Sequence, residues 1–151
     1  MAKGIKSITR TVAFHNATAL ASGSNLILTQ ADMGTSRNGL LILSVNYTTN
    51  PILDLHVASS YATGLSVTTL NVASDNCTIV QDTVNSTGTV TIASKKISSI
   101  AVDGIYVFNV HDIRRYTNLQ YTSAGTGTVI SAILIGTDGE QVPYAAATAG
   151  Y

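Results

Sequence analysis

The sequence lacks several residue types on which other protein classes depend. It contains one cysteine, two prolines and no tryptophan. An intrachain disulfide is therefore impossible, and the position of Cys77 in the strand-like run 77–80 predicts a small buried side chain rather than a reactive thiol. A chain of 151 residues needs no disulfide or metal for stability, because a domain of this size buries most of the surface that its unfolded chain exposes.

Charged residues are also scarce. They make up 11% of the chain, against roughly 25% in ordinary globular proteins, and the formal net charge is zero. This balance argues against a nucleic-acid partner, because phosphate binding needs a basic face, and against an anionic membrane surface. Low net charge favours association between proteins. A hydrophobic fraction of 45% is also the wrong composition for a disordered chain.

Long apolar runs are missing as well. No stretch approaches the roughly 18 consecutive apolar residues of a membrane-spanning helix. Residues 1–10 include basic side chains, but the apolar segment of a secretory signal peptide does not follow them. We therefore expect a soluble protein with no membrane partner.

The residues that are abundant are those typical of β-strands and turns. Thr, Ser, Val, Ile, Leu, Ala and Gly predominate, whereas Glu140 is the only glutamate and there are four lysines. β-branched side chains fit a pleated sheet better than a helix, and no window keeps a helical apolar period. The pattern predicts eight to ten short strands, the main ones being 5–14, 40–47, 53–57, 67–72, 78–84, 89–93, 97–102, 105–110, 116–122 and 128–135. The first is a possible edge strand, and the last is expected to be central and buried on both faces.

Turn signals recur every 8–12 residues or so along the chain, as in an all-β sandwich. We predict a single domain over 1–151 with an antiparallel β-sandwich fold of jelly-roll or Greek-key kind. Residues 1–10 form a possible N-terminal arm. Residues 141–151 have no strand pattern and are expected to form a C-terminal arm.

The sequence contains no specific catalytic motif. A G-x-S-x-G elbow and a phosphate-binding loop are both absent. Asp54 and His56 lie two residues apart on a predicted strand, so they point to the same side, as a metal pair or a catalytic dyad would. A zinc site needs three or four converging ligands. We therefore interpret the pair as surface-facing, and we expect no catalytic, cofactor-binding or metal-binding residue and no enzymatic activity.

Arginine and tyrosine indicate contact regions instead. Arg114 and Arg115 are adjacent and precede Tyr116 at the start of a predicted strand. Both residue types are enriched at interface hot spots, and arginine binds carboxylates through two parallel hydrogen bonds. We expect at least one arginine to form an interface or an inter-strand salt bridge. Tyr144 and Tyr151 in the C-terminal arm are further candidates for a protein interface. Tyr47 and Tyr61 also fall at strand ends or in loops.

One segment resembles a known family. Residues 104–136 (GIYVFNVHDIRRYTNLQYTSAGTGTVISAILIG) follow a pattern of strand, Arg-Tyr, strand, glycine turn and strand, and residues 78–84 (TIVQDTV) are similar in style. The pattern resembles that of small structural proteins of tailed bacteriophages, the jelly-roll capsid cement or decoration proteins. The resemblance implies a β-sandwich dimer or trimer on the capsid exterior, bound to the major capsid protein.

The leading hypothesis is therefore a structural, non-enzymatic cement protein of the virion, made in the bacterial cytoplasm. Its expected contact regions are the two termini and the corner at 111–116. The alternative is a carbohydrate- or receptor-binding β-sandwich of a phage tail or fibre. That reading needs an aromatic platform or an ion site, and the sequence has no tryptophan and no acidic cluster.

Overall fold

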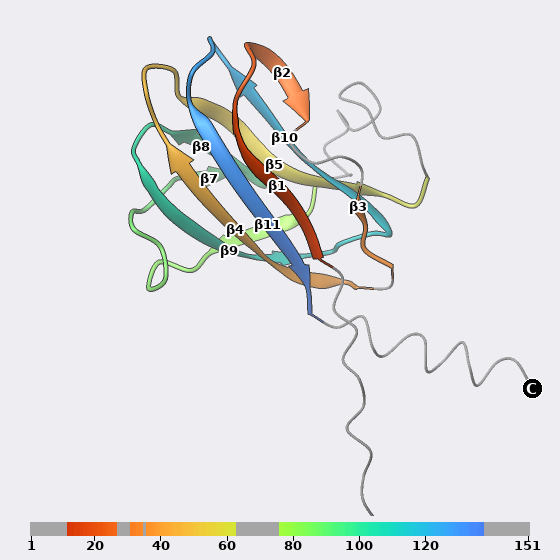
Figure 1. Cartoon of the computed structure of the whole chain (residues 1–151). Helices are drawn as coiled ribbons and strands as arrows, with labels where there is room; N and C mark the ends of the chain where they lie inside the picture. The colour runs from red at the N-terminus through yellow and green to blue at the C-terminus, as the bar shows by residue number, and fades with distance from the viewer. Residues whose placement is uncertain (1–11, 27–30, 35, 63–75, 138–151) are drawn as a thin grey trace, which may run out of the picture.

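The computed structural model describes residues 12–26, 31–34, 36–62 and 76–137. Within these ranges the protein is all-β, with eleven strands and no helix, and so with no apolar helix of membrane-spanning length. The strands form two antiparallel sheets that pack against each other (Figure 1). The predicted antiparallel β-sandwich is confirmed. The jelly-roll connectivity remains a prediction.

Sheet A contains five strands in the order β1-β11-β4-β9-β6. Its central strand β4 is hydrogen-bonded to β11 on one side and to β9 on the other, over eight residue pairs each. The bounds are β1 Val12–Ala19, β4 Asn38–Asn46, β6 Thr78–Gln81, β9 Gly104–His111 and β11 Val129–Gly136.

Sheet B has the order β2-β10-β5-β8-β7, and β3 pairs with the beginning of β10. The long strands β5 and β10 lie side by side at its centre. The bounds are β2 Gly23–Leu26, β3 Ala31–Asp32, β5 Ile52–Ser60, β7 Ile92–Ala93, β8 Lys96–Ile100 and β10 Tyr116–Ser123.

The core lies between the sheets and follows the two-residue period of the strands. On the inner face of β4, Leu41 and Leu43 are at most 1% exposed. Leu41 pairs with Phe108 of β9 and with Leu134 of β11, both fully buried, so three neighbouring strands add large apolar side chains to one layer. From sheet B, fully buried Leu119 belongs to the same apolar cluster.

Most of the predicted strands are confirmed, with boundaries shifted by a few residues. β4, β5, β9, β10 and β11 cover the runs predicted at 40–47, 53–57, 105–110, 116–122 and 128–135. Each run is long and rich in Val, Ile, Leu or Tyr, and turn residues bound it. The weaker prediction at 97–102 corresponds to β8.

Other predicted strands are wrong in part. The strand predicted at 5–14 continues to Ala19, and its residues 5–11 lie outside the described ranges. The run 78–84 ends as a strand at Gln81, because the carboxylate of Asp82 accepts hydrogen bonds from the amides of Val84 and Asn85 and turns the chain. The run 89–93 is a strand only at its last two residues. The short strands β2 and β3 were not predicted. The described residues do not include the predicted strand 67–72 or the predicted arms at 1–10 and 141–151.

The expectation that β11 is buried on both faces is also wrong. β11 has neighbours on both sides in sheet A, but only one of its faces lies against the core. Ile133 on the opposite face is 40% exposed. The apolar pattern therefore reflects a surface that this chain does not cover with its described residues.

Two adjacent positions of β4 test the assignment of the inner and outer faces. Leu43→Ala should lower the free energy of unfolding by about 2–5 kcal/mol, because it leaves a cavity in the core. Ser44→Ala, one residue later on the exposed face, should change it by less than about 0.5 kcal/mol. Urea unfolding of both variants measures the difference, and equal effects would contradict the assignment.

Candidate functional site

The two ends of the described chain lie at one end of the sandwich, which is the lower end in Figure 1. Val12 at the start of β1 pairs with Ile135 near the end of β11. The amide of Thr137, the last described residue, donates a hydrogen bond to the carbonyl of Asn38 at 3.1 Å. Asn38 pairs in turn with His111 at the end of β9. The connection from β9 to β10 begins here.

This connection is a tight corner that is anchored on both sheets. Asp112 has a φ of 65°, in the left-handed region, which reverses the chain after β9. Ile113 is fully buried, and its amide donates to the carbonyl of Arg37 at 2.9 Å. The next amide, that of Arg114, donates to Ser59 Oγ on β5 at 3.1 Å. The corner therefore holds two consecutive arginines in fixed positions at the end of the sandwich.

Tyr61, just after β5, lies between two guanidinium groups. Arg37 Nη1 donates a hydrogen bond to the Tyr61 hydroxyl at 2.6 Å, and the Arg37 guanidinium carbon lies 5.5 Å from the ring centroid. The guanidinium carbon of Arg114 lies 5.7 Å from the same centroid. Both distances are within the range of cation–π attraction. The Tyr61 side chain is nevertheless 63% exposed, so a partner can reach the ring.

These residues line a shallow pocket of about 340 Å³. Its walls also include Asn38, Asp112 and Ile113. Asp112 Oδ2 accepts a hydrogen bond from Thr78 Oγ1 at 2.8 Å. Two guanidinium groups and one carboxylate line the pocket, so the charge balance of its walls is positive.

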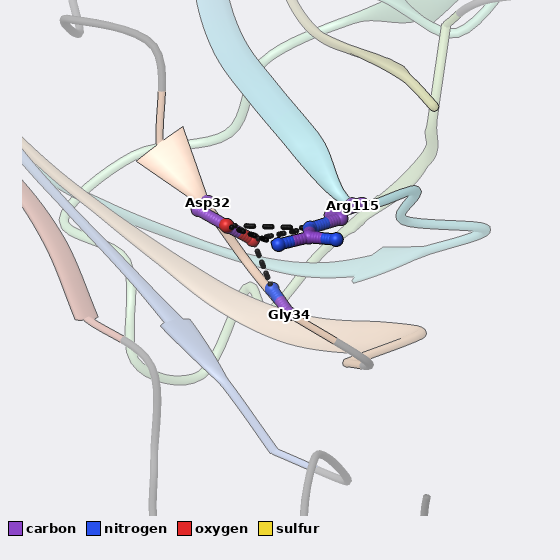
Figure 2. Close-up of polar contacts among 3 residues, drawn as sticks. All are labelled: Asp32, Gly34 and Arg115. Carbon is purple, nitrogen blue, oxygen red and sulfur yellow. Dashed lines mark hydrogen bonds and ion pairs between the residues drawn. The ribbon is translucent and has the colours of Figure 1, made fainter. Parts of the chain in front are cut away.

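Arg115 is not among the residues that line this pocket, and it pairs with Asp32 of β3. Figure 2 shows the two side chains facing each other, with Arg115 Nε 3.2 Å from Asp32 Oδ1 and Nη2 3.1 Å from Oδ2. The hydrogen bond from Arg115, and a second one from the Gly34 amide, hold the pKa of Asp32 below its usual value. The Arg115 guanidinium also lies over the Tyr116 ring, 5.1 Å from its centroid.

We refer to Arg37, Tyr61, Arg114, Arg115 and Tyr116 as the Arg–Tyr end. The expected salt bridge is present, because Arg115, which immediately precedes β10, pairs with Asp32 of β3. Arg114 instead contacts the Ser59 carbonyl at 3.4 Å and the face of Tyr61. The interface role of these residues remains a prediction, and Tyr144 and Tyr151 lie outside the described residues.

Sequence reasoning missed Arg37. A signal was available, because two strands joined by a short connection run in opposite directions, so the residue before the first strand and the residue after the second lie at the same end of a sandwich. Arg37 precedes β4 and Tyr61 follows β5. No pattern in the sequence shows, however, that their side chains are in contact.

The interpretation of Asp54 and His56 as a surface-facing pair is wrong. Asp54 is exposed, but His56 is only 4% exposed. Asp54 has a φ of 50°, and the register of β5 against β10 shifts between Gln120 and Thr122. This β-bulge breaks the alternation on which the interpretation rested.

The bulge also prevents the Asp–His dyad that the sequence spacing suggested. His56 Nδ1 donates to the backbone carbonyl of Asp54 at 2.6 Å, and not to its carboxylate. Burial is the main cause that lowers the pKa of His56. Across the described ranges, no three residues among His, Cys, Asp and Glu come together as metal ligands would.

Cys77 lies beneath the Arg–Tyr end and is fully buried, as expected for a small core residue. Its sulfur lies 3.2 Å from Ser59 Oγ, the atom that also accepts the Arg114 amide. Burial raises the pKa of the thiol to about 11. Cys77 therefore supports the corner by packing.

The buried His56 predicts a pH dependence of stability. Because its pKa is lower in the folded protein, its contribution is fully present above the ordinary value of 6.5 and is lost as the pH falls from there through the folded pKa. Thermal unfolding should shift to lower temperature over this window. His56→Gln should reduce the shift, and His111→Asn, at an exposed histidine, should retain it. A shift of the same size in His56→Gln would argue against this assignment.

The buried Cys77 predicts an inert thiol. Ellman's reagent at mildly alkaline pH should react with the unfolded protein at once and with the native protein only as it unfolds, since the thiol is both inaccessible and protonated. Fast labelling of the native protein would contradict its placement in the core.

Comparisons of this chain with protein-family models, curated proteins and solved structures found no match.

Proposed function

We propose that this protein is a structural, non-enzymatic capsid decoration protein of a bacteriophage, which binds the outer surface of the major capsid lattice through its Arg–Tyr end. One observation carries the proposal. The pocket between Arg37, Tyr61 and Arg114 lies at the same end of the sandwich as both ends of the described chain. Residues 1–11 and 138–151 are joined to the sandwich there.

The chemistry of the Arg–Tyr end supports binding to a protein. Guanidinium groups bind carboxylates in a planar geometry, and exposed tyrosine provides apolar area with a polar tip. Arg37 is held by the Tyr61 hydroxyl and by the Ile113 carbonyl, at 2.6 and 3.5 Å. A side chain that is already held loses less conformational entropy when a partner binds. The positive balance of the pocket favours an acidic segment of the capsid protein.

The terminal segments support binding at many sites on a lattice. A terminal segment that contacts the neighbouring subunit adds buried area to a contact that is small by itself. When two linked contacts are made at once, the second forms at a high effective concentration, so weak contacts combine into strong attachment. The pocket and the points where both segments begin can face the same subunit of a capsid.

A second candidate function rests on the same pocket. Its volume of about 340 Å³ lies at the lower limit of small-molecule sites, and the exposed Tyr61 ring offers a surface on which a sugar could stack. A carbohydrate-binding protein of a phage tail or fibre would use these features for an acidic glycan. Strong hits on a glycan array, lost in Tyr61→Ala, would favour this function over decoration.

Binding to capsids tests the leading proposal. The purified protein should co-sediment with capsids of its phage that lack it, and should raise the temperature at which they open. The double variant Arg37→Ala/Arg114→Ala should bind about tenfold more weakly or worse, because arginines at hot spots often contribute more than about 1 kcal/mol each.

Lys95→Ala/Lys96→Ala provides the matched control, since it removes the same charge from Lys95 in the turn after β7 and from Lys96 at the start of β8. The control should bind capsids as the wild type does. Absence of wild-type binding would reject the decoration function. Equal losses in the two double variants would show that only net charge matters, and would reject the Arg–Tyr end as the contact.

A further inference from the structure

The outer face of sheet A carries half-buried and exposed apolar side chains among polar ones such as Ser44, Asn46 and Asn109. Along β4 the side chains alternate, so that Leu41 and Leu43 are buried in the core while Leu40 and Ile42 are half-buried on the opposite face. β11 follows the same rule, with Ile133 40% exposed on the outside. Apolar residues therefore occupy both faces of the two central strands. One of these faces packs against sheet B, and the other is at the surface.

The strand register joins these residues into one patch. Ile42 pairs with Ile133, and Leu40 with Ile135. On the other side of β4, Ser44 pairs with Ile105, which is 49% exposed. At the edge, Val80 is 51% exposed. We call this surface the outer patch; it consists of Leu40, Ile42, Val80, Ile105, Ile133 and Ile135.

Charge is absent from the strands that carry the outer patch. None of the five strands of sheet A contains Asp, Glu, Lys or Arg. An exposed face of an antiparallel sheet is normally polar, which prevents association. Sheet B differs in both respects. In β10 the side chains that alternate with core residues include the polar Asn118 and Gln120, and these are at most 5% exposed. The outer patch is an uncharged surface of half-buried and exposed apolar side chains, with the paired Ser44 and Ser131 among them.

A second copy of the same face fits this surface. A charged partner surface would lose its hydration against the outer patch and gain no counter-charge. An identical uncharged face has no such cost, and a two-fold axis makes any patch complementary to itself in position. Flat sheets also pack face to face at about 10 Å, as the two sheets of a sandwich do.

The size of the face is sufficient. Four strands of eight or nine residues and one of four, at about 3.3 Å per residue and spaced by about 4.8 Å, give the outer face of sheet A an area of about 590 Å² per copy. Two copies would bury about 1,200 Å², the lower limit of a stable interface. We propose that sheet A of one copy packs face to face on sheet A of a second copy through the outer patch, forming a symmetric homodimer.

The proposal does not depend on the decoration function. The Arg–Tyr end is built from strand ends and connections, whereas the dimer interface is the outer face of the strands. Loss of one contact therefore need not remove the other. A dimer that does not bind capsids would overturn only the decoration function, and a monomer that binds them would overturn only the dimer.

Mass measurement in solution tests the dimer. Sedimentation equilibrium of the full chain at micromolar to submillimolar concentration should give twice the chain mass of 15.7 kDa. Ile133→Lys and Ile105→Lys should each give the monomer mass, because each places an unpaired charge in an apolar interface. Val102→Lys is the matched control. Val102 is 65% exposed in the connection between β8 and β9, so this variant should remain a dimer.

Circular dichroism checks that each variant keeps its β-structure. If a lysine variant does not fold, Ser44→Cys gives a second test, because Ser44 is exposed on the outer face and the native Cys77 is buried. Spin labels at this cysteine should show a dipolar coupling between copies. A monomeric wild type would overturn the proposal. If such a monomer dimerised after deletion of residues 138–151, that segment would be identified as the occupant of the outer patch, and the proposal would again be overturned. A dimer that both lysine variants retain would overturn it too.

Discussion

The two-residue period of β4 and its neighbours is the constraint on which the rest of the structure depends. β4 forms eight-pair ladders with both β11 and β9. Because successive side chains point to opposite faces, the run LLIL at 40–43 must present apolar groups on both sides of sheet A. The inner side is the core of the sandwich. The outer side is exposed unless another surface covers it. Exposing apolar side chains to water is unfavourable, and this free-energy cost explains why a chain with little charge is expected to associate.

The same ladders determine where polar chemistry can gather. The strands of sheet A carry no charged residue, so the charged side chains among the described residues lie in sheet B, in turns and at strand ends. At one end, the corner at Asp112 and the anchor at Ile113 hold Arg114 beside Tyr61 and Arg37. The result is a division of the surface into a partly apolar face whose strands carry no Asp, Glu, Lys or Arg and a cationic, aromatic end. The first suits a copy of the same surface, and the second suits an acidic segment.

Much of the fold could be predicted from the sequence, because long apolar β-branched runs bounded by turn residues determine both strand type and approximate bounds. β4, β9 and β11 are examples. Short strands such as β3 could not be predicted. Two residues are too few to show an alternating pattern, and β3 is a strand only because it pairs with β10. The bulge at Asp54 was equally hidden. It depends on the register against β10, and it moved His56 from the predicted surface into a buried position.

The candidate site could be predicted in part. Adjacent arginines before Tyr116 indicated the corner, but the residues that complete the pocket, Arg37 and Tyr61, are 24 positions apart and meet only in the folded chain. Burial of β11 on both faces was predicted from its apolar run, whereas the structure shows that one face, with Ile133, is not covered by the described residues. Hydroxyl-radical footprinting of the full chain at its working concentration tests the central claim most directly. Ile105 and Ile133 should be protected far more than their exposed fractions imply, with Val102 fully labelled. Labelling of all three in proportion to their exposure would contradict the account.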